Sequence, residues 1–359
     1  MKILHIVEDF SVKSGGLRSA IYSLDDHLKK DGFQSYILSS EKEKEDTIYT
    51  VPATNKWLYH KDWINKIDSI VSEKKIDIIH IHGVWLYPQY IGAKYAVKNN
   101  IPFVFSCHGM YQPWLWKKGT LKKKLYLHFL SKKWFRKAKV IHTITENETK
   151  NTRKFFKKAQ FIEIPNLVSF STTEAVPDFS DKYILYLGRL NKTKGIDVLI
   201  TAFANIVDKK VTLKIAGGFN DYKKELETLV KTYKLGERVE FLGEVKGTIK
   251  EKLIQNAWAM VSPTFSDVIG IVNLEAGLFK TPMITTYKTG LKNAWNSNGG
   301  FLIEPTISEL EKALTEVVNY TIEKRIAKGE QLHAFVKENY SWEQQFPKWK
   351  DLYELTLKS

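Results

Sequence analysis

Residues 183–200 read YILYLGRLNKTKGIDVLI and decide the fold of the second half of the chain. The unbroken apolar run Tyr183–Leu187 predicts a strand that is buried on both faces, because a strand with one wet face alternates apolar and polar residues. A basic, glycine-containing turn follows, and a helical pattern opens at Ile196. Strand, turn and helix in this order predict an α/β domain with a parallel sheet.

The same alternation extends in both directions from this stretch. It begins afresh after residues 165–177, a stretch poor in charge. We therefore expect two doubly wound, Rossmann-like α/β domains, residues 1–168 and 169–340. The predicted strands are Lys2–Val7, Gln34–Ser39, Ile76–His82, Pro102–Cys107, Lys139–Ile144, Gln160–Ile164, Tyr183–Leu187, Val211–Ala216, Arg238–Leu242, Trp258–Ser262 and Pro282–Thr286. Predicted helices between them include Leu17–Lys30, Asp62–Lys74, Gln89–Lys98, Ile196–Val207, Tyr222–Tyr233 and Ile249–Trp258.

Composition limits the partners and the compartment. The 359 residues contain one cysteine, Cys107, and no apolar run that resembles a signal peptide or a membrane span, so we expect a cytoplasmic protein. The formal net charge of +15 predicts an anionic partner. Nucleic acid, anionic lipid and a phosphorylated substrate all fit that charge.

Two glycine-containing turns are candidates for phosphate binding. Gly15 and Gly16 follow Ser14 and open the first predicted helix, whose N-terminal amides would face a phosphate. Gly188 and Arg189, with Lys194, follow the strand Tyr183–Leu187, and ligands of such sheets bind at the carboxyl ends of the strands. We therefore expect a ligand in the cleft between the two domains. A plain turn and a solvated basic turn are the competing interpretations, and the dinucleotide pattern G-x-G-x-x-G is absent.

Two carboxylates mark a third candidate site. Asp267 and Glu275 flank the start of a predicted helix, where the amides of Ile271, Val272 and Asn273 would face phosphate oxygens. Helix capping and a favourable interaction with the helix dipole are the alternative roles for these two acids.

Histidines supply a fourth candidate. His108 closes the strand Pro102–Cys107 and is followed by Gly109, which places the imidazole where it could hydrogen-bond a ligand. A turn histidine satisfied by its neighbours is the alternative. His80 and His82 share one face of a strand, but no further ligand has metal-site spacing in the sequence, so we expect no metal.

With these four signals in this order, the chain resembles the family 4 retaining glycosyltransferases of the GT-B fold over nearly its whole length. The matching stretches are SGGLRSAIYSLDDHLKKDG, DIIHIHG, FSCHGM, HTITENE, IPN, LGRLNKTKGIDVLI, IAGG, VEFLG and FSDVIGIVNLEAGLFKTPMIT. The stretch HGMYQPW with basic residues after it is similar to bacterial surface-polysaccharide members. The resemblance implies that a final helix, about residues 341–359, packs back onto the first domain.

The resemblance also implies roles for the residues that hold the donor phosphates. Gly15, Gly16 and the amides of residues 271–273 would contact phosphate oxygens. Arg189 and Lys194 would neutralise the leaving diphosphate, so that neither a metal nor another cofactor is required. The donor would be a nucleotide-diphosphate sugar, preferably of uridine and otherwise guanosine diphosphate mannose, and the sugar would be transferred with retention of configuration.

The remaining implied roles concern the sugar and the ribose. His108 would hydrogen-bond the transferred sugar, Asp267 its hydroxyls, and Glu275 the ribose. The family usually has glutamate where this chain has Asp267, whose side chain is one methylene shorter.

A basic, aromatic-rich stretch without any acid lies between Ile78 and Thr145. As a helix from Thr120 it would carry one apolar stripe through Leu121 and Phe129 and another through Leu127 and Trp134, so that one stripe packs inward and the other meets something else. We expect an anionic membrane surface, at the inner face of the cytoplasmic membrane, or a lipid-linked diphosphate acceptor. A nucleic-acid groove and a solvated face are the alternatives. The candidate contacts are Trp114, Trp116, Lys117, Lys118, Lys122, Lys123 and Lys124.

Together with these features, the resemblance implies a retaining sugar transferase that acts in bacterial O-antigen, capsule or lipopolysaccharide synthesis. A sugar-nucleotide epimerase of similar fold is one alternative. A basic nucleic-acid-binding protein is the other, and only the charge favours it.

Overall fold

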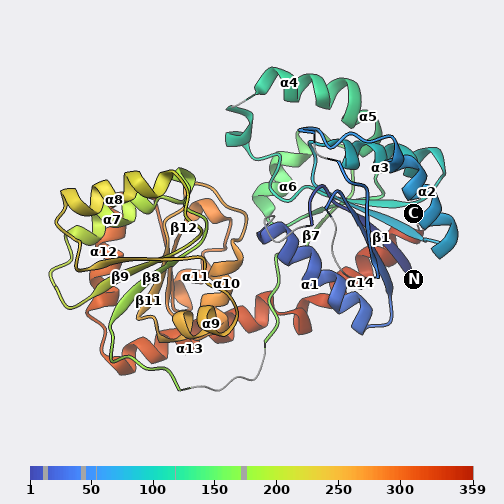
Figure 1. Cartoon of the computed structure of the whole chain (residues 1–359). Helices are drawn as coiled ribbons and strands as arrows, with labels where there is room; N and C mark the ends of the chain where they lie inside the picture. Colours follow the sequence, from blue (N-terminus) through green and yellow to red (C-terminus); the bar gives the residue numbers. More distant parts are fainter. Residues whose placement is uncertain (11–14, 42–45, 54, 118, 171–175, 359) are drawn as a thin grey trace. The chain divides into compact units, whose positions relative to one another are not determined.

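The computed structural model of the chain describes residues 1–10, 15–41, 46–53, 55–117, 119–170 and 176–358 (Figure 1). The chain forms two compact units, one of Met1–Asn166 with Gln345–Ser359 and the other of Leu167–Gln344. Each unit has its own parallel sheet with helices around it, so the predicted class of two Rossmann-like α/β domains is confirmed.

The sheet of the first unit has the strand order β3-β2-β1-β4-β5-β6-β7. Chain order reverses between β1 and β4, so the carboxyl ends of these two strands form a topological switch point. The strands are β1 Lys2–Ile6, β2 Gln34–Ser39, β3 Ile48–Thr50, β4 Ile78–His82, β5 Phe103–Ser106, β6 Val140–Thr143 and β7 Phe161–Glu163. The helices are α1 Gly16–Lys30, α2 Asp62–Lys74, α3 Tyr87–Lys98, η2 Pro113–Lys117, α4 Thr120–Leu125, η3 Tyr126–Ser131, α5 Lys132–Phe135, α6 Glu146–Arg153 and α14 Trp342–Lys358.

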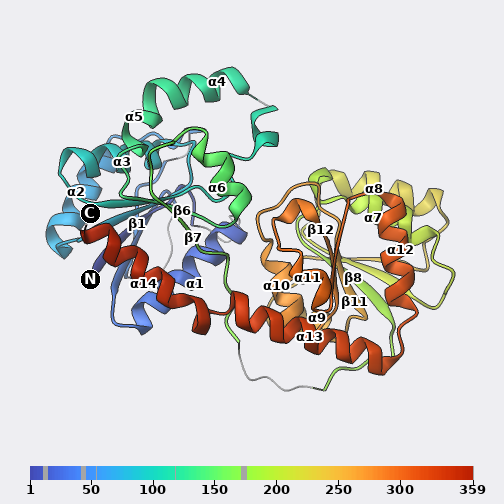
Figure 2. The ribbon, with the colours of Figure 1, turned by 180° about the vertical axis from the view of Figure 1, so that it is seen from behind.

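The last helix, α14, packs on this first sheet although it is the most distant in sequence (Figure 2). The Tyr353 hydroxyl lies 2.8 Å from Nδ1 of His80 on β4, and the ring centroid of Trp349 lies 4.5 Å from that of His142 on β6. Lys350 pairs with Asp31 at the end of α1, at 3.0 Å. α14 is therefore part of the first unit's core.

The sheet of the second unit has the order β10-β9-β8-β11-β12-β13, with its switch point between β8 and β11. Its strands are β8 Tyr183–Leu187, β9 Thr212–Ala216, β10 Val239–Gly243, β11 Ala259–Ser262, β12 Met283–Thr286 and β13 Gly300–Ile303. Its helices are η4 Lys192–Lys194, α7 Ile196–Ala204, α8 Tyr222–Thr232, α9 Gly247–Asn256, α10 Ile271–Leu278, η5 Tyr287–Thr289, α11 Ala294–Ser297, α12 Ile307–Val318 and α13 Ile322–Tyr340.

Burial explains why the central strands are apolar throughout. All five residues of β8 are buried, because helices such as α7 and α12 pack on the sheet and leave the strand no wet face. The edge strand β3 and the strand β13 are not among the predicted strands. They have three and four residues, but length alone does not explain the omission, because β7 and β12 are as short and were predicted.

The helix predicted from Thr120 forms as three consecutive pieces: α4, the π-helical η3 and α5. The stripe of Leu121, Leu125 and Phe129 is exposed, at 71%, 47% and 70%, whereas Leu127 is buried. One stripe thus packs on the unit and the other does not, as the pattern predicts. No helix within the described ranges is long and apolar enough to span a bilayer.

Candidate active site

In the second unit, the loops after β8 and β11 are joined by backbone contacts at the switch point. The amide of Phe265 donates to the Thr193 carbonyl at 2.8 Å, and the Thr264 hydroxyl donates to the same oxygen at 3.1 Å. These bonds bring Lys194 and Asp267 together, with Nζ 2.6 Å from Oδ2. The two side chains are 18% and 22% exposed, so the pair remains open to a ligand.

Gly195 makes this close approach possible. It has φ +67°, a left-handed conformation that glycine adopts without strain, and it caps the N-terminus of α7. A Cβ atom at this position would lie 2.2 Å from the carbonyl oxygen of Pro263. Any larger residue would therefore push apart the two loops that carry Lys194 and Asp267.

Arg189 is the second cation at the carboxyl end of β8. Its side chain is exposed, and its carbonyl accepts a hydrogen bond from the Tyr186 hydroxyl at 2.9 Å. Its guanidinium makes no ion pair with any residue that the structure describes. Arg189 and Lys194 thus provide two cations at one strand end, which is the charge arrangement that a diphosphate requires.

The loop before α10 is strained, and the helix contains an unsatisfied amide. Ile269 has φ +39°, a conformation that costs energy for a β-branched residue. Gly270 caps α10, and Asn273 in its first turn is fully buried. Neither the oxygen nor the nitrogen of the Asn273 side-chain amide has a partner in the described part of the chain. Buried unpaired amides are rare, so this group is available for a further partner.

Glu275 lies one turn further along α10 and pairs with Lys250 of α9, Oε1 to Nζ at 2.5 Å. Its second oxygen, Oε2, is buried and accepts no hydrogen bond from the described residues. Sequence reasoning identified Glu275 but not Lys250, because the lysine is 25 positions away and is one of many in a basic chain.

In the first unit, Gly15 caps the N-terminus of α1 with φ +62°. No atom of the residues that the structure describes lies within 4 Å of a Cβ built on Gly15 or Gly16, which leaves room for a ligand on that side of the backbone. The first turn of α1 contains no acid that would compete for an anion. Ser14, the first residue of this candidate turn, lies outside the described residues.

His108 lies in the turn that follows β5, and the buried side chain of Glu148 hydrogen-bonds this turn. His108 and Gly109 both have positive φ, +48° and +76°. Glu148 of α6 accepts hydrogen bonds from the amides of Gly109 and Ile144, the latter at 2.6 Å. Burial raises the pKa of Glu148 to about 7 even though these two bonds favour its charged form.

A chain of hydrogen-bonded histidines leads from the core to His108. Nδ1 of His5 lies 2.9 Å from Nε2 of His82, and Nδ1 of His82 lies 2.9 Å from Nε2 of His108. Burial lowers the pKa of all three, to about 4 for His5 and about 3 for His108, so each ring is neutral near pH 7. A neutral imidazole donates from one nitrogen only, so the three tautomers are coupled.

His5, His80 and His82 also bring one ring nitrogen each within 4.8 Å of one another, which is metal-like in ligand type. The nitrogens of His80 are bonded to the Tyr353 and Ser106 hydroxyls, at 2.8 and 2.7 Å, and those of His82 to two other histidines. A metal would have to displace these bonds, so the arrangement fits a hydrogen-bonded network better than a metal centre.

Glu8 is a residue that sequence reasoning did not select. It follows β1 at the first unit's switch point and accepts a hydrogen bond from the side-chain amide of Gln89. Its carboxylate packs closely against Gly83, where a Cβ would lie only 2.7 Å from Oε2 of Glu8. Burial raises its pKa to about 7. A carboxyl group that titrates near neutral pH at a strand end is a candidate for proton transfer.

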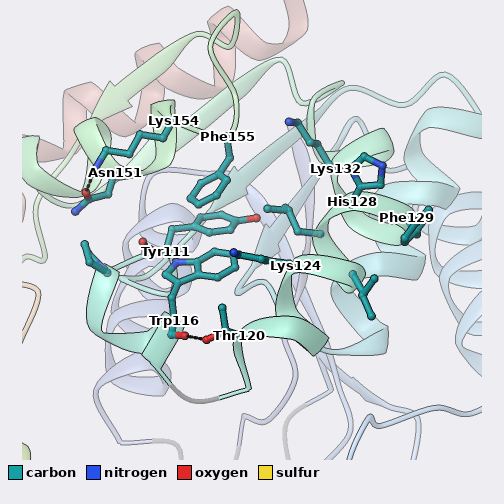
Figure 3. A pocket seen from close by; sticks show the side chains of 13 residues that line it. Tyr111, Trp116, Thr120, Lys124, His128, Phe129, Lys132, Asn151, Lys154 and Phe155 are labelled. Atoms are coloured by element: carbon teal, nitrogen blue, oxygen red, sulfur yellow. Dashed lines mark hydrogen bonds between the residues drawn. The ribbon is translucent and has the colours of Figure 1, made fainter.

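The basic, aromatic-rich stretch contributes to the surface of the first unit and to a pocket. Trp114 is 42% exposed, and Lys122 and Lys124 are exposed as well. Lys123 bonds the Leu115 carbonyl and lies 5.5 Å from the centre of the Trp85 ring. Trp116 and Lys124 line an apolar pocket of about 770 Å³ (Figure 3). Lys117 ends η2, and Lys118 lies outside the described residues.

Comparisons with protein families agree with this fold. Residues 14–171 match the model described as Glycosyltransferase Family 4, and residues 174–342 match Glycosyl transferases group 1. The chain is thus a glycosyltransferase of the GT-B fold, with one half matching each model.

The chain is also similar to individual proteins. It is 24% identical to the phosphatidylinositol N-acetylglucosaminyltransferase gpi3 subunit of Schizosaccharomyces pombe, over 94% of this chain and 77% of that protein. It is 30% identical to the capsular polysaccharide biosynthesis glycosyltransferase CapM of Staphylococcus aureus, over 35% of this chain and 33% of that one. Anabaena HepE, solved with UDP and glucose, aligns with a TM-score of 0.78 at 16% identity over 99% of both chains, which is a likeness of fold.

Proposed function

We propose that this glycosyltransferase takes its sugar from a nucleotide-diphosphate donor, preferably a uridine one, and transfers it with retention and without a metal. One observation carries the proposal: Arg189 and Lys194 both lie in the loop that follows the carboxyl end of β8, at the switch point of the second unit. In a Rossmann-like sheet this is where a nucleotide binds.

The leaving diphosphate gains negative charge as the sugar–phosphate bond breaks. Arg189, which has no described ion-pair partner, would clamp phosphate oxygens, and the first-turn amides of α10 would face them. Lys194 already contacts Asp267, so its ammonium would be shared between that carboxylate and a phosphate. Preorganised cations of this kind stabilise the transition state and do the work that a metal does in other transferases.

The acids and amides around these cations would hold the rest of the donor. Asp267 would accept hydrogen bonds from sugar hydroxyls. Oε2 of Glu275, buried and unpartnered among the described residues, would accept one from the ribose. The buried side-chain amide of Asn273 would hydrogen-bond the donor and so gain the partner that it lacks among the described residues.

In the first unit, the backbone amides of Gly15 and Gly16 would contact a phosphate of the donor. His108 would hydrogen-bond the transferred sugar, and the leaving phosphate would help to deprotonate the acceptor hydroxyl. HepE, whose structure contains UDP, supports the preference for uridine.

We propose a lipid-linked acceptor at the inner face of the cytoplasmic membrane, in the synthesis of a surface polysaccharide such as capsule, O-antigen or lipopolysaccharide. The relatives support this: CapM is named for capsular polysaccharide, and the gpi3 subunit for a phosphatidylinositol acceptor. The exposed stripe of Leu121, Leu125 and Phe129 beside Lys122 and Lys124 fits an anionic membrane surface.

A thermal-shift panel of UDP, GDP, CDP and their common sugars, each with and without EDTA, tests the donor proposal. We expect stabilisation by a uridine nucleotide that EDTA does not reduce and that Arg189→Ala weakens. Stabilisation that requires added metal would contradict metal independence. The anomeric signal of the product by NMR tests retention, since an inverted linkage would exclude it.

A further inference from the structure

An apolar pocket of about 770 Å³ lies in the first unit, and its walls include residues of η2, α4, η3 and α6. Its interior is aromatic: the Trp116 ring is stacked 5.1 Å from Phe155 and 6.4 Å from Tyr111, centroid to centroid (Figure 3). The volume is that of a site for a sizeable organic ligand. The pocket does not contain His108 or any residue proposed to hold the donor.

The pocket opens onto exposed apolar surface. Leu125 and Phe129 line it and are 47% and 70% exposed, and they belong to the same exposed stripe as Leu121. An apolar chain that lay along this stripe could therefore extend into the pocket past Leu125 and Phe129.

A second, strongly basic pocket of about 350 Å³ adjoins the first and shares Lys132, Lys154 and Phe155 with it. None of its basic residues forms an ion pair with another described residue, and Lys154 bonds only the Asn151 amide oxygen, at 2.9 Å. Such a cluster favours a phosphorylated group. Its basic residues are Lys132, Arg136, Lys137, Lys154, Lys157 and Lys158.

The buried hydroxyl of Tyr111 is independent evidence for a ligand in the apolar pocket. Its side chain is 1% exposed and lines the apolar pocket, and its hydroxyl has no hydrogen-bond partner among the residues described. Buried tyrosine hydroxyls are normally bonded, so a polar atom of a ligand, near the start of its apolar part, would satisfy it.

We propose that these two pockets together form a binding site for a phosphorylated lipid, with its hydrocarbon chain among Tyr111, Trp116 and Phe155 and its phosphate on Lys132 and Lys154. One amphiphile matches both pockets, because the apolar and the basic walls meet at Phe155 and these two lysines. The inference rests on the proposed function only in identifying this lipid as the carrier of the acceptor.

Calorimetric titration of the full-length protein with farnesyl diphosphate tests the site, with UDP present to occupy the proposed donor site. Inorganic diphosphate and farnesol are the head-only and chain-only probes. We expect each of these to bind at least about tenfold more weakly than farnesyl diphosphate, because each fills one pocket only.

Matched variants separate the pockets from general surface charge. Lys132→Ala with Lys154→Ala should weaken farnesyl diphosphate binding by about tenfold or more. Lys98→Ala with Lys133→Ala removes two exposed lysines of the same unit that line neither pocket, and it should change binding less than about threefold. Phe129→Asp should likewise weaken binding more than Leu121→Asp, since the two residues are equally exposed but only Phe129 lines the pocket.

Equal losses in the paired variants, or equal binding of diphosphate and farnesyl diphosphate, would overturn the proposal, because surface charge alone would then explain binding. The donor site is separable: Lys194→Ala should retain farnesyl diphosphate binding, and the Lys132, Lys154 double variant should retain UDP binding. Lipid binding with no response to any nucleotide would leave the lipid site standing and would reject the proposed donor.

Discussion

Lys194 and Asp267 are 73 positions apart in the chain, yet Nζ of the lysine lies 2.6 Å from Oδ2 of the aspartate. The contact joins the loops after β8 and β11, which are neighbouring strands at the switch point. Asp267 therefore fixes the position of the ammonium, and in the proposed function this cation would need little rearrangement when charge develops on the leaving group.

Lys194→Ala should reduce sugar transfer by about a hundredfold or more, because a preorganised charge at the leaving group would be lost. Lys192→Ala is the matched control, since Lys192 is in the same turn, is exposed and pairs with Glu225. Initial rates at saturating donor give the comparison. Transfer by Lys194→Ala at the wild-type rate would contradict the assignment of the leaving-group site to the carboxyl end of β8.

Glu275→Gln should weaken donor binding about tenfold and leave kcat nearly unchanged, because a ribose contact is made equally in the ground and transition states. Lys250→Met should have a smaller effect in the same direction, through loss of the ion pair that orients the carboxylate. Glu304→Gln, in an exposed ion pair with Lys288, is the control. A lowered kcat with unchanged binding would contradict the ribose assignment.

His82→Gln should lower kcat about tenfold with little change in donor affinity, because His108 would lose the neighbour that sets its tautomer. His80→Gln is equally buried but bonds Ser106 and Tyr353, so it controls for the loss of stability. The 15N shifts of the His108 ring report the tautomer directly. Unchanged 15N shifts in His82→Gln would show that the tautomer of His108 does not depend on its hydrogen bond to His82.

Gly195→Ala should destabilise the second unit by about 2 kcal/mol or more, since its Cβ would collide with the Pro263 carbonyl and φ is positive. Gly218→Ala is the control, because nothing lies within 4 Å of a Cβ built there. Chemical denaturation measures both. Wild-type stability in Gly195→Ala would mean that the loops of β8 and β11 are not tightly joined.

The first unit should lose stability as the pH falls below about 6.5. Burial lowers the pKa of five histidines, His5, His80, His82, His108 and His142, so that the unfolded chain takes up their protons while the folded one does not. Glu8 and Glu148 act in the opposite sense, because their raised pKa of about 7 makes the folded state take up protons first.

The five histidines outnumber the two glutamates, so we expect the folded first unit to lose stability on acidification. Thermal unfolding at about pH 7.5, 6.5 and 5.5 should show a falling Tm, with a shallower slope in His142→Gln, which removes one of the five. A Tm that rises on acidification would show that the carboxyl groups dominate.

The arrangement of elements was largely predictable, because burial on both faces leaves a visible apolar run wherever a central parallel strand lies. β8 begins and ends at the predicted residues, and α2 does as well. The helix from Thr120 was harder to predict, since its π-helical middle breaks the 3.6-residue period. The short strands β3 and β13 were missed, although strands of the same length such as β7 and β12 were predicted.

The candidate site divides in a similar way. Gly188, Arg189, Lys194 and Asp267 were recognisable because each lies in a loop that follows a predicted strand. Glu8 directly follows the predicted strand Lys2–Val7, so the same signal could have identified it. Lys250 and the partners of His108 were not recognisable, because nothing in their neighbourhood distinguishes them from other lysines and core histidines.

The order of strands, turns and helices was determined by the sequence alone, because apolar periodicity and glycine placement act over a few residues. Tertiary structure decided which side chains meet: Lys194 with Asp267, Glu275 with Lys250, His5 with His82 and His108, and the lysines around Phe155. Those contacts depend on which strands and helices become neighbours and in what register, and local sequence does not encode that geometry.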